Sequence, residues 1–269
     1  MHRFFVDKDD IEGEVVRVTG SDFNHISHSL RMQKGDCFIV NNGDGLDYTV
    51  KIKDITEEMV IAEIIDKERN RNETTINVTL AQAIPKKSNM DLIVQKCTEI
   101  GAKKIIPINT SRTIVKLSGK KLERRIDRWQ KIAQEAAKQS RRGIIPEIKE
   151  LINFQELKPL FKNYDLVLVP WEDEEVHGLR EIWNSMYLDL NKNETGPKCQ
   201  KEKSHEQEHN EKNILIIIGP EGGFSSVEIK FIQDNGGHAI TLGPRILRTE
   251  TAGLVALTAV LYQAGELGG

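Results

Sequence analysis

The segment 214–253 constrains the fold most strongly, because two apolar runs within it each end in a glycine-rich turn. The first run, 214–218, is continuous and apolar, which is typical of a strand buried on both faces of a sheet. It ends at the turn 219–223 (GPEGG), which can neither continue a strand nor start a helix. The second run, 238–242, ends at another glycine-proline turn. Ligands bind outside the carboxyl ends of strands in open parallel sheets, so these two turns are the predicted site.

A helix signal follows each turn. Ser225 and Glu228 form a capping-box pattern, and the glycine pair 236–237 ends the helix that they start. A second helix is expected from about Thr251, with apolar residues on one face. The turns and helix starts together present Glu221, Arg245, Arg248, Thr249, Glu250 and Thr251. A binding or catalytic site would explain so many polar groups beside buried strands, and two tight turns with solvated charges are the alternative.

Length and cysteine content narrow the classes of protein. The chain has 269 residues, enough for one large domain or two ordinary ones. Its three cysteines are odd in number and lack zinc-ligand spacing, so neither a disulfide framework nor a metal site is predicted. The N-terminus lacks a signal-peptide pattern and no apolar run is long enough to span a membrane, so a cytoplasmic location is expected.

The distribution of charge suggests a nucleic-acid partner. The net charge is −3, yet residues 112–149 hold twelve Lys or Arg and only four Asp or Glu. A basic stripe on an otherwise acidic protein is an electrostatic footprint for nucleic acid. The helical pattern over 120–142 places Arg124 and Arg128 opposite its apolar stripe. It ends at a pair of arginines, 141–142, and a merely solvated helix face is the alternative.

The pattern of elements changes along the chain. Residues 1–71 contain short runs of β-branched residues around one short helical piece, which predicts a small barrel. From 76 to 269 strands and helices alternate, which predicts an α/β domain. In the first part, Arg3 and Arg31 are the arginines that can face a partner. Arg31 follows a helix end, where a cation also interacts favourably with the helix dipole.

Two polar segments interrupt this pattern. Residues 67–75 (KERNRNETT) lack an apolar period and are predicted to form a linker. Residues 191–213 contain no apolar residue except one cysteine, so they cannot bury enough surface to offset the entropy of ordering. We expect 191–213 to be a mobile insertion at the surface.

The motifs carry a resemblance to a known family. GPEGGFSSVEI followed by LGPRILRTETAGLVAL resembles the RsmE family of ribosomal RNA methyltransferases, part of the SPOUT superfamily. The segments NMDLIVQKCTEIGAKKIIPINTSRT, WQKIAQEAAKQSRRGIIPEI and HISHSLRMQKGD also resemble that family, so the similarity spans nearly the whole chain. It implies a PUA-like β-barrel, then a SPOUT-type α/β domain with a deep trefoil knot, assembled as a homodimer. It also implies methyl transfer from S-adenosylmethionine to N3 of a uridine in 16S ribosomal RNA of the small subunit.

The same resemblance places the methyl donor against three loops, which follow Val169, Ile218 and Leu242. The residues it assigns to the donor are Pro170, Ile218, Gly219, Glu221, Gly222, Gly223, Leu242, Gly243, Ile246, Leu247, Arg248 and Thr251. Among them, Leu242, Ile246 and Leu247 are expected to enclose the adenine. The insertion at 191–213 is longer and more polar than the family pattern between its two flanking strands.

Methyl transfer to uracil N3 would require a cation at the site. The uracil N3 proton must leave, so the reacting base carries a negative charge that a positioned cation would stabilise. Arg248 is the first choice for that role, with Arg141 or Arg142 second. Glu221 either accepts the proton or binds a backbone amide and shapes the turn. The target base must leave its stack, and the expected RNA contacts are Arg3, Arg31, Arg124, Arg128 and Arg142.

Three other functions compete with this one. The chain could be an RNA-binding module without chemistry, or an S-adenosylmethionine-dependent methyltransferase of the same fold that acts on transfer RNA. It could also be a phosphate-handling enzyme, since glycine turns at helix starts favour anions. Neither a GxxxxGK[ST] nor a GxGxxG pattern occurs in the sequence, which argues against that third function.

Overall fold

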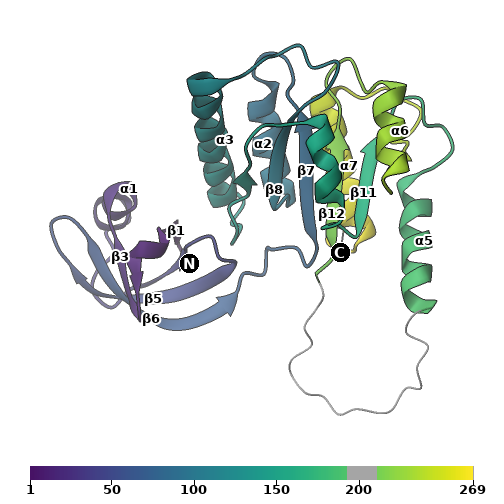
Figure 1. The fold of residues 1–269 in the computed structure, drawn as a ribbon. Coiled ribbons are helices and arrows are strands. Elements are labelled where there is room, and N and C mark those ends of the chain that lie inside the picture. Colours follow the sequence, from purple (N-terminus) through teal and green to yellow (C-terminus); the bar gives the residue numbers. More distant parts are fainter. Residues whose placement is uncertain (193–210, 269) are drawn as a thin grey trace. The chain divides into compact units, whose positions relative to one another are not determined.

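The computed structural model describes residues 1–192 and 211–268, which divide into two compact units (Figure 1). The first unit comprises Met1–Glu73 with Gln134–Ile145, and the second comprises Thr74–Ala133 with Pro146–Gly269. The segment 134–145 was not expected in the first unit. It belongs there because Gly45 N donates to Gly143 O, and Glu73 accepts hydrogen bonds from two amides of the same segment.

The first unit is a six-stranded sheet in the order β1-β4-β5-β6-β3-β2. Its strands are β1 (Arg3–Phe5), β2 (Ile11–Glu12), β3 (Val15–Val18), β4 (Cys37–Asn41), β5 (Leu46–Ile55) and β6 (Val60–Arg69). Strand β1 is parallel to β4 and the other pairs are antiparallel. The sheet curls around its own apolar core (Figure 1). The predicted small β unit is confirmed, as a curled sheet whose outer strands β1 and β2 do not pair within the described residues.

A short helical piece lies between β3 and β4, as predicted. It consists of α1 (Gly20–Asn24) and the π-helical turn His25–Ser29. A separate 3-10 turn, Lys8–Asp10, lies between β1 and β2. Phe23 and Ile26 are buried in the core of the unit, which accounts for their helical spacing in the sequence.

The predicted linker at 67–75 is correct only in part: the boundary between the two units falls within it, between Glu73 and Thr74, but its first residues are not a linker. Strand β6 continues to Arg69, and Asn70 and Thr74 after it are buried, whereas Arg71, Asn72 and Thr75 are exposed. Asn70 donates to Asp47 at 2.9 Å, and Asp47 also receives two hydrogen bonds from Arg3. The Glu73 carboxylate is buried against Arg142. A polar run resembles a linker in composition, but here the side chains of Asn70 and Glu73 are paired in a buried network.

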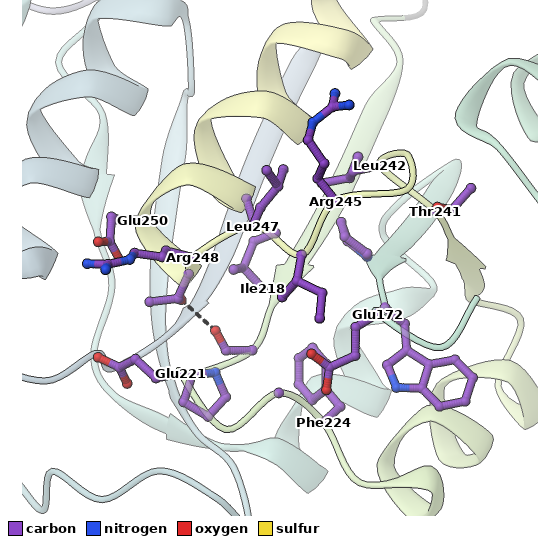
Figure 2. Close-up of a pocket in the computed structure, with 18 of the residues that line it drawn as sticks. Glu172, Ile218, Glu221, Phe224, Thr241, Leu242, Arg245, Leu247, Arg248 and Glu250 are labelled. Carbon is purple, nitrogen blue, oxygen red and sulfur yellow. Dashed lines mark hydrogen bonds between the residues drawn. The ribbon is translucent and has the colours of Figure 1, made fainter. Parts of the chain in front are cut away.

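The second unit is a parallel sheet in the order β10-β8-β7-β12-β11-β13, with β9 pairing to β8. Its strands are β7 (Asn77–Ala83), β8 (Lys104–Asn109), β9 (Glu147–Ile148), β10 (Ile152–Asn153), β11 (Leu166–Pro170), β12 (Asn213–Ile218) and β13 (His238–Ile240). The predicted α/β domain is confirmed. Segments that follow the strands at their carboxyl ends line a pocket (Figure 2).

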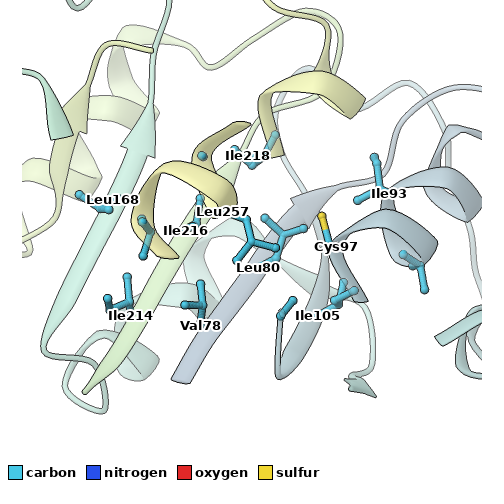
Figure 3. Close-up of a cluster of buried hydrophobic side chains, with 14 of the residues drawn as sticks. Val78, Leu80, Ile93, Cys97, Ile105, Leu168, Ile214, Ile216, Ile218 and Leu257 are labelled. Carbon is cyan, nitrogen blue, oxygen red and sulfur yellow. The ribbon is translucent and has the colours of Figure 1, made fainter. Parts of the chain in front are cut away.

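Helices cover both faces of this sheet. They are α2 (Asn89–Ile100), α3 (Gly119–Gln139), α4 (Lys158–Phe161), α5 (Leu179–Lys192), α6 (Ser226–Asp234) and α7 (Thr249–Gln263), with a 3-10 turn at Phe154–Leu157. In β12, Ile214, Ile216 and Ile218 pack in the cluster with α2 and α7 (Figure 3), whereas Leu215 and Ile217 pack in the cluster with α6. The continuous apolar run therefore forms a strand buried on both faces, as expected.

Helix boundaries near the turns follow the sequence signals. The Ser225 hydroxyl accepts a hydrogen bond from Glu228 N, which completes the predicted capping box of α6. Helix α7 begins at Thr249, two residues before the predicted start, with Arg248 as its N-cap residue. The trefoil knot is not established by the strand order and stays a prediction.

Most of the predicted insertion lies outside the described residues. Of 191–213, the structure describes only the end of α5 and the segment that leads into β12. Within the described ranges, no helix has both the length and the apolar character needed to cross a membrane.

Candidate functional site

A pocket of about 990 Å³ lies at the carboxyl end of the parallel sheet. Segments that follow β7, β11, β12 and β13 line it (Figure 2). The lining residues include Lys86, Lys87, Asn89, Pro170, Trp171, Glu172, Glu174, Glu175, Ile218, Gly219, Pro220, Glu221, Gly223, Phe224, Thr241, Leu242, Gly243, Pro244, Arg245, Ile246, Leu247, Arg248, Thr249 and Glu250. The two glycine-rich turns therefore meet in one pocket, as their position after parallel strands predicts.

Most residues assigned to the methyl donor lie in this lining. They are Pro170, Ile218, Gly219, Glu221, Gly223, Leu242, Gly243, Ile246, Leu247 and Arg248. The structure places two of the predicted residues outside the lining. Gly222 is exposed and its carbonyl accepts a hydrogen bond from Arg112, whereas Thr251 is exposed in the first turn of α7. Thr249 lines the pocket and is buried.

The first turn requires glycine at particular positions. Gly223 has φ +63°, a left-handed conformation that other residues rarely adopt, and a Cβ there would lie 2.8 Å from Glu172 Oε1. At Gly219 a Cβ would lie 3.1 Å from the ring of Phe224. A side chain at Gly223 would therefore strain the backbone, and one at Gly219 would require the Phe224 ring to move by a few tenths of an ångström.

A buried hydrogen-bond chain holds the pocket together. Gln82 Nε2, at the end of β7, donates to Thr249 Oγ1 at 2.9 Å, and Thr249 Oγ1 donates to Gly219 O at 2.6 Å. Gln82 is fully buried. Sequence analysis missed it, although a glutamine in an otherwise apolar strand is a usable signal, since a buried amide needs partners.

Charged groups divide between the walls of the pocket. Figure 2 shows Arg248 extending to the same side as Glu221 and Glu250, whereas Arg245 extends away from Glu172. The acidic residues Glu172, Glu174 and Glu175 line a separate wall after β11. Within the described residues, no group of three or more His, Cys, Asp or Glu could hold a metal ion.

Glu221 has a structural contact. Its Oε1 accepts a hydrogen bond from Lys86 N at 2.7 Å, which links the turn after β12 to the loop after β7. This contact favours the interpretation in which Glu221 binds a backbone amide and shapes the turn. The same loop brings Lys86 and Lys87 to the pocket, and sequence analysis had not singled out either lysine.

Glu228 fixes the far side of the turn. Its carboxylate accepts hydrogen bonds from the amide and hydroxyl of Ser111 and from the amide and hydroxyl of Ser225, at 2.8–2.9 Å. Burial alone would raise the pKa of the Glu228 carboxyl, but these hydrogen bonds outweigh burial and lower the pKa from its ordinary value of 4.5. The charged carboxylate therefore ties the loop after β8 to the start of α6.

The five arginines predicted to bind RNA have different surroundings. Arg31 and Arg124 are exposed. Arg3 forms a bidentate pair with Asp47, with distances of 2.7 and 2.8 Å, and Arg128 Nη2 lies 2.8 Å from Asp91 Oδ2. The fifth, Arg142, is buried.

Arg142 requires a correction. It is 2% exposed and its guanidinium binds the Glu73 carboxylate, so it cannot reach a phosphate in this structure. This burial argues against both predicted roles of Arg142, the RNA contact and the second-choice catalytic cation. The contact with Glu73 indicates a structural role instead. The preceding residue, Arg141, is exposed in the first unit in a left-handed conformation with φ 58°, and its carbonyl accepts a hydrogen bond from Asn72.

The fold and the pocket define a class of α/β protein with a candidate ligand site at the carboxyl ends of a parallel sheet. The family model for an RNA methyltransferase domain matches residues 72–261, and the model for an RNA methyltransferase PUA domain matches residues 18–65. The chain belongs to the RNA methyltransferase family that includes ribosomal RNA small subunit methyltransferase E.

Relatives match the chain over nearly its whole length. Ribosomal RNA small subunit methyltransferase E of Bacillus subtilis is 33% identical over 272 residues, covering 100% of this chain and 99% of that protein. The protein of the same name from Mesomycoplasma hyopneumoniae is 33% identical, covering 96% of this chain and 98% of that one. The crystal structure of the Neisseria gonorrhoeae protein of that name, bound to S-adenosyl methionine, is 27% identical with a TM-score of 0.73, covering 97% of each chain.

Proposed function

We propose that the protein transfers a methyl group from S-adenosylmethionine to N3 of one uridine in 16S ribosomal RNA, within the small ribosomal subunit. The observation that carries the proposal is the pocket of about 990 Å³ between the two glycine-rich turns, in a chain of this family. Its size lies at the upper end of the range of roughly 300–1,000 Å³ found for small-molecule sites.

The residues present fit the methyl donor. Trp171 lines the pocket, and its buried Nε1 has no hydrogen-bond partner among the described residues, so an acceptor on a ligand would satisfy it. Ile246 is 83% exposed beside the pocket, and an adenine ring would cover it. Glu172 and Glu174 supply negative charge for the cationic part of the donor. When bound, S-adenosylmethionine supplies an electrophilic methyl group.

The proposed catalytic group is Arg248. Its side chain is exposed at the pocket, and its backbone is the N-cap of α7. It stabilises the negative charge that the uracil carbonyl oxygens carry once the N3 proton has left. A hydrogen bond from a charged group contributes about 1.5–3 kcal/mol. Arg141 remains the second candidate, and Glu221 shapes the turn.

The proposed RNA contacts outside the pocket are Arg31, Arg124, Arg3 and Arg128. The exposed side chains of Arg31 and Arg124 are accessible to phosphates. Arg3 and Arg128 already bind carboxylates, so either one would contribute less to RNA affinity than an unpaired arginine.

The proposed assembly is a homodimer. Helix α7 exposes Val255 and Tyr262, the latter 65% exposed, and a second copy of the chain would cover such apolar side chains. Light scattering after gel filtration tests this, and a monomeric mass would contradict it.

Because the proposed substrate is the ribosomal subunit, we expect the protein in the cytoplasm.

The decisive experiment is transfer of labelled methyl from S-adenosylmethionine to small ribosomal subunits that lack the modification. Digestion and mass spectrometry then identify the product nucleoside. We expect 3-methyluridine at one site. Methyl transfer to transfer RNA but not to subunits would favour the alternative enzyme, and donor binding without transfer to any RNA would contradict the proposed substrate.

A further inference from the structure

Three basic residues lie at the pocket or against the turn after β12, and they have no place in the roles assigned so far. Lys86 and Lys87 follow β7 and line the pocket, and Arg112 follows β8. All three are exposed. We refer to these three residues as the basic row.

The turn after β12 holds the basic row in place. Glu221 Oε1 accepts from Lys86 N at 2.7 Å, and Arg112 Nη1 donates to Gly222 O at 2.7 Å. Arg112 also packs on this turn, since a Cβ at Gly222 would lie only 3.4 Å from Arg112 Cβ. Consecutive residues of one turn therefore hold the backbone of the loop after β7 and the guanidinium of Arg112.

The backbone of Lys87 has an uncommon conformation. Its φ is 57°, in the left-handed region that residues other than glycine, asparagine and aspartate rarely occupy. Within the described residues, Lys86 and Lys87 form no ion pair with a carboxylate. A lysine in an uncommon conformation, at a pocket edge and without a carboxylate partner, is the kind of outlier from which function is inferred.

The charge of the basic row does not match the methyl donor. S-adenosylmethionine has one carboxylate, and its sulfonium and ammonium groups call for the acidic wall at Glu172 and Glu174. The row has three cations, and Arg112 does not line the pocket, so the row extends beyond the space that a small ligand would fill. A ligand with repeated negative charges matches such a row better.

We propose that the basic row binds the phosphodiester backbone of a single-stranded RNA segment that flanks the methylated nucleotide. This inference rests on the proposed function. A base that is turned out of its stack needs its strand held on both sides of the pocket mouth, and phosphate contacts fix position without reading sequence. Lys86, Lys87 and Arg112 therefore position the substrate strand, while Arg248 acts on the base.

The test compares Lys87→Asn with Lys87→Arg. Asparagine tolerates the left-handed backbone and removes the charge, whereas arginine keeps the charge. Lys230→Asn is the matched control, because Lys230 is exposed on α6 and does not line the pocket. Initial rates are measured with unmethylated small ribosomal subunits at saturating S-adenosylmethionine over a series of salt concentrations. Calorimetry gives the dissociation constant of S-adenosylmethionine for each variant.

We expect Lys87→Asn to raise KM for subunits roughly tenfold, the effect of one lost charged hydrogen bond. The slope of log affinity against log salt should fall by about one, as for one lost phosphate contact. Affinity for S-adenosylmethionine should not change, and Lys230→Asn and Lys87→Arg should resemble the wild type. A second variant, Lys86→Asn with Arg112→Gln, should add to the loss of subunit affinity.

Two results would overturn the inference. Wild-type KM and salt slope in all row variants would show that the row is only solvated. Weaker binding of S-adenosylmethionine with an unchanged KM for subunits would assign the row to the donor carboxylate. If Lys87→Asn lowers the melting temperature, Lys87→Gly repeats the test with a residue that accepts the same φ. Absence of methyl transfer by the wild type would instead count against the proposed function.

Discussion

Thr249 Oγ1 donates a hydrogen bond to Gly219 O across a distance of 2.6 Å. This contact joins the first residue of α7 to the first residue of the turn after β12, and Gln82 donates to the same hydroxyl from the end of β7. Three segments that are far apart in the sequence therefore share one buried hydroxyl group. The pocket walls depend on this group for their relative position.

Thr249→Val should destabilise the protein and loosen the pocket. Valine keeps the shape but leaves Gly219 O without its donor and removes a partner of Gln82, which costs about 1–3 kcal/mol. Urea denaturation should show this loss, and calorimetry should show weaker binding of S-adenosylmethionine. Thr249→Ser keeps the hydroxyl and is the matched control, so equal behaviour of the two variants would contradict this role.

The two neighbouring glycines of the turn should respond differently to alanine. At Gly223 the left-handed φ disfavours alanine by about 1–2 kcal/mol, and the Glu172 carboxylate must move away. At Gly222 the backbone is not in that region and a Cβ would make an ordinary contact with Arg112. We expect Gly223→Ala to lower both stability and donor affinity, and Gly222→Ala to have little effect on either. Donor titration and thermal melting of both variants check this, and a larger effect at Gly222 would contradict it.

Arg142→Ala should be strongly destabilising. Its side chain and that of Glu73 are 3% and 2% exposed, and removing one member of a buried ion pair leaves the other charge uncompensated, at about 3–5 kcal/mol. Arg128→Ala is the matched control, because its pair with Asp91 is open to solvent and should contribute little. Urea denaturation of both variants measures the difference. A stable Arg142→Ala protein with weaker RNA binding would contradict the structural role and support the RNA contact predicted from the sequence.

The sequence predicted what depends on local pattern. The run at 214–218 has aliphatic residues on both faces, so its double burial follows from composition alone. Ser225 and Glu228 are three residues apart, so their capping contact needs no knowledge of the rest of the chain. The glycine turns follow these strands, and the sheet order brings them together.

The sequence did not predict contacts between distant segments. Nothing local to Arg142 distinguishes it from the exposed Arg141, because Glu73 is its partner, nearly seventy residues away. The hydrogen bond from Lys86 N to Glu221 joins residues 135 apart in the sequence, so local pattern reasoning cannot reveal it. Residue type alone does not show whether a polar group is solvated or paired in the interior.

Glu228 should make the stability depend on acid pH. Its carboxyl has a lowered pKa in the folded state, so its contribution is fully present above about pH 4.5 and is lost as the pH falls through the folded pKa. Glu228→Gln should therefore be less stable than the wild type at neutral pH and should lose less stability below pH 4.5. Glu123→Gln, at an exposed position of α3, is the control. Denaturation across acid pH measures the two slopes, and equal slopes in wild type and Glu228→Gln would contradict this account.

Arg248→Ala should separate donor binding from turnover. The guanidinium is proposed to stabilise the uracil anion, so its loss should lower kcat roughly 10- to 100-fold while S-adenosylmethionine affinity and fold stay close to wild type. Without this cation the N3 proton leaves less readily, so the rate of the variant should recover as the pH rises. Arg245→Ala is the comparison, and it should keep its turnover. Arg245 comes from the same segment as Arg248, but its side chain extends away from Glu172 (Figure 2). Wild-type turnover in Arg248→Ala, or a parallel pH profile, would assign the role to another cation, with Arg141 next to be tested.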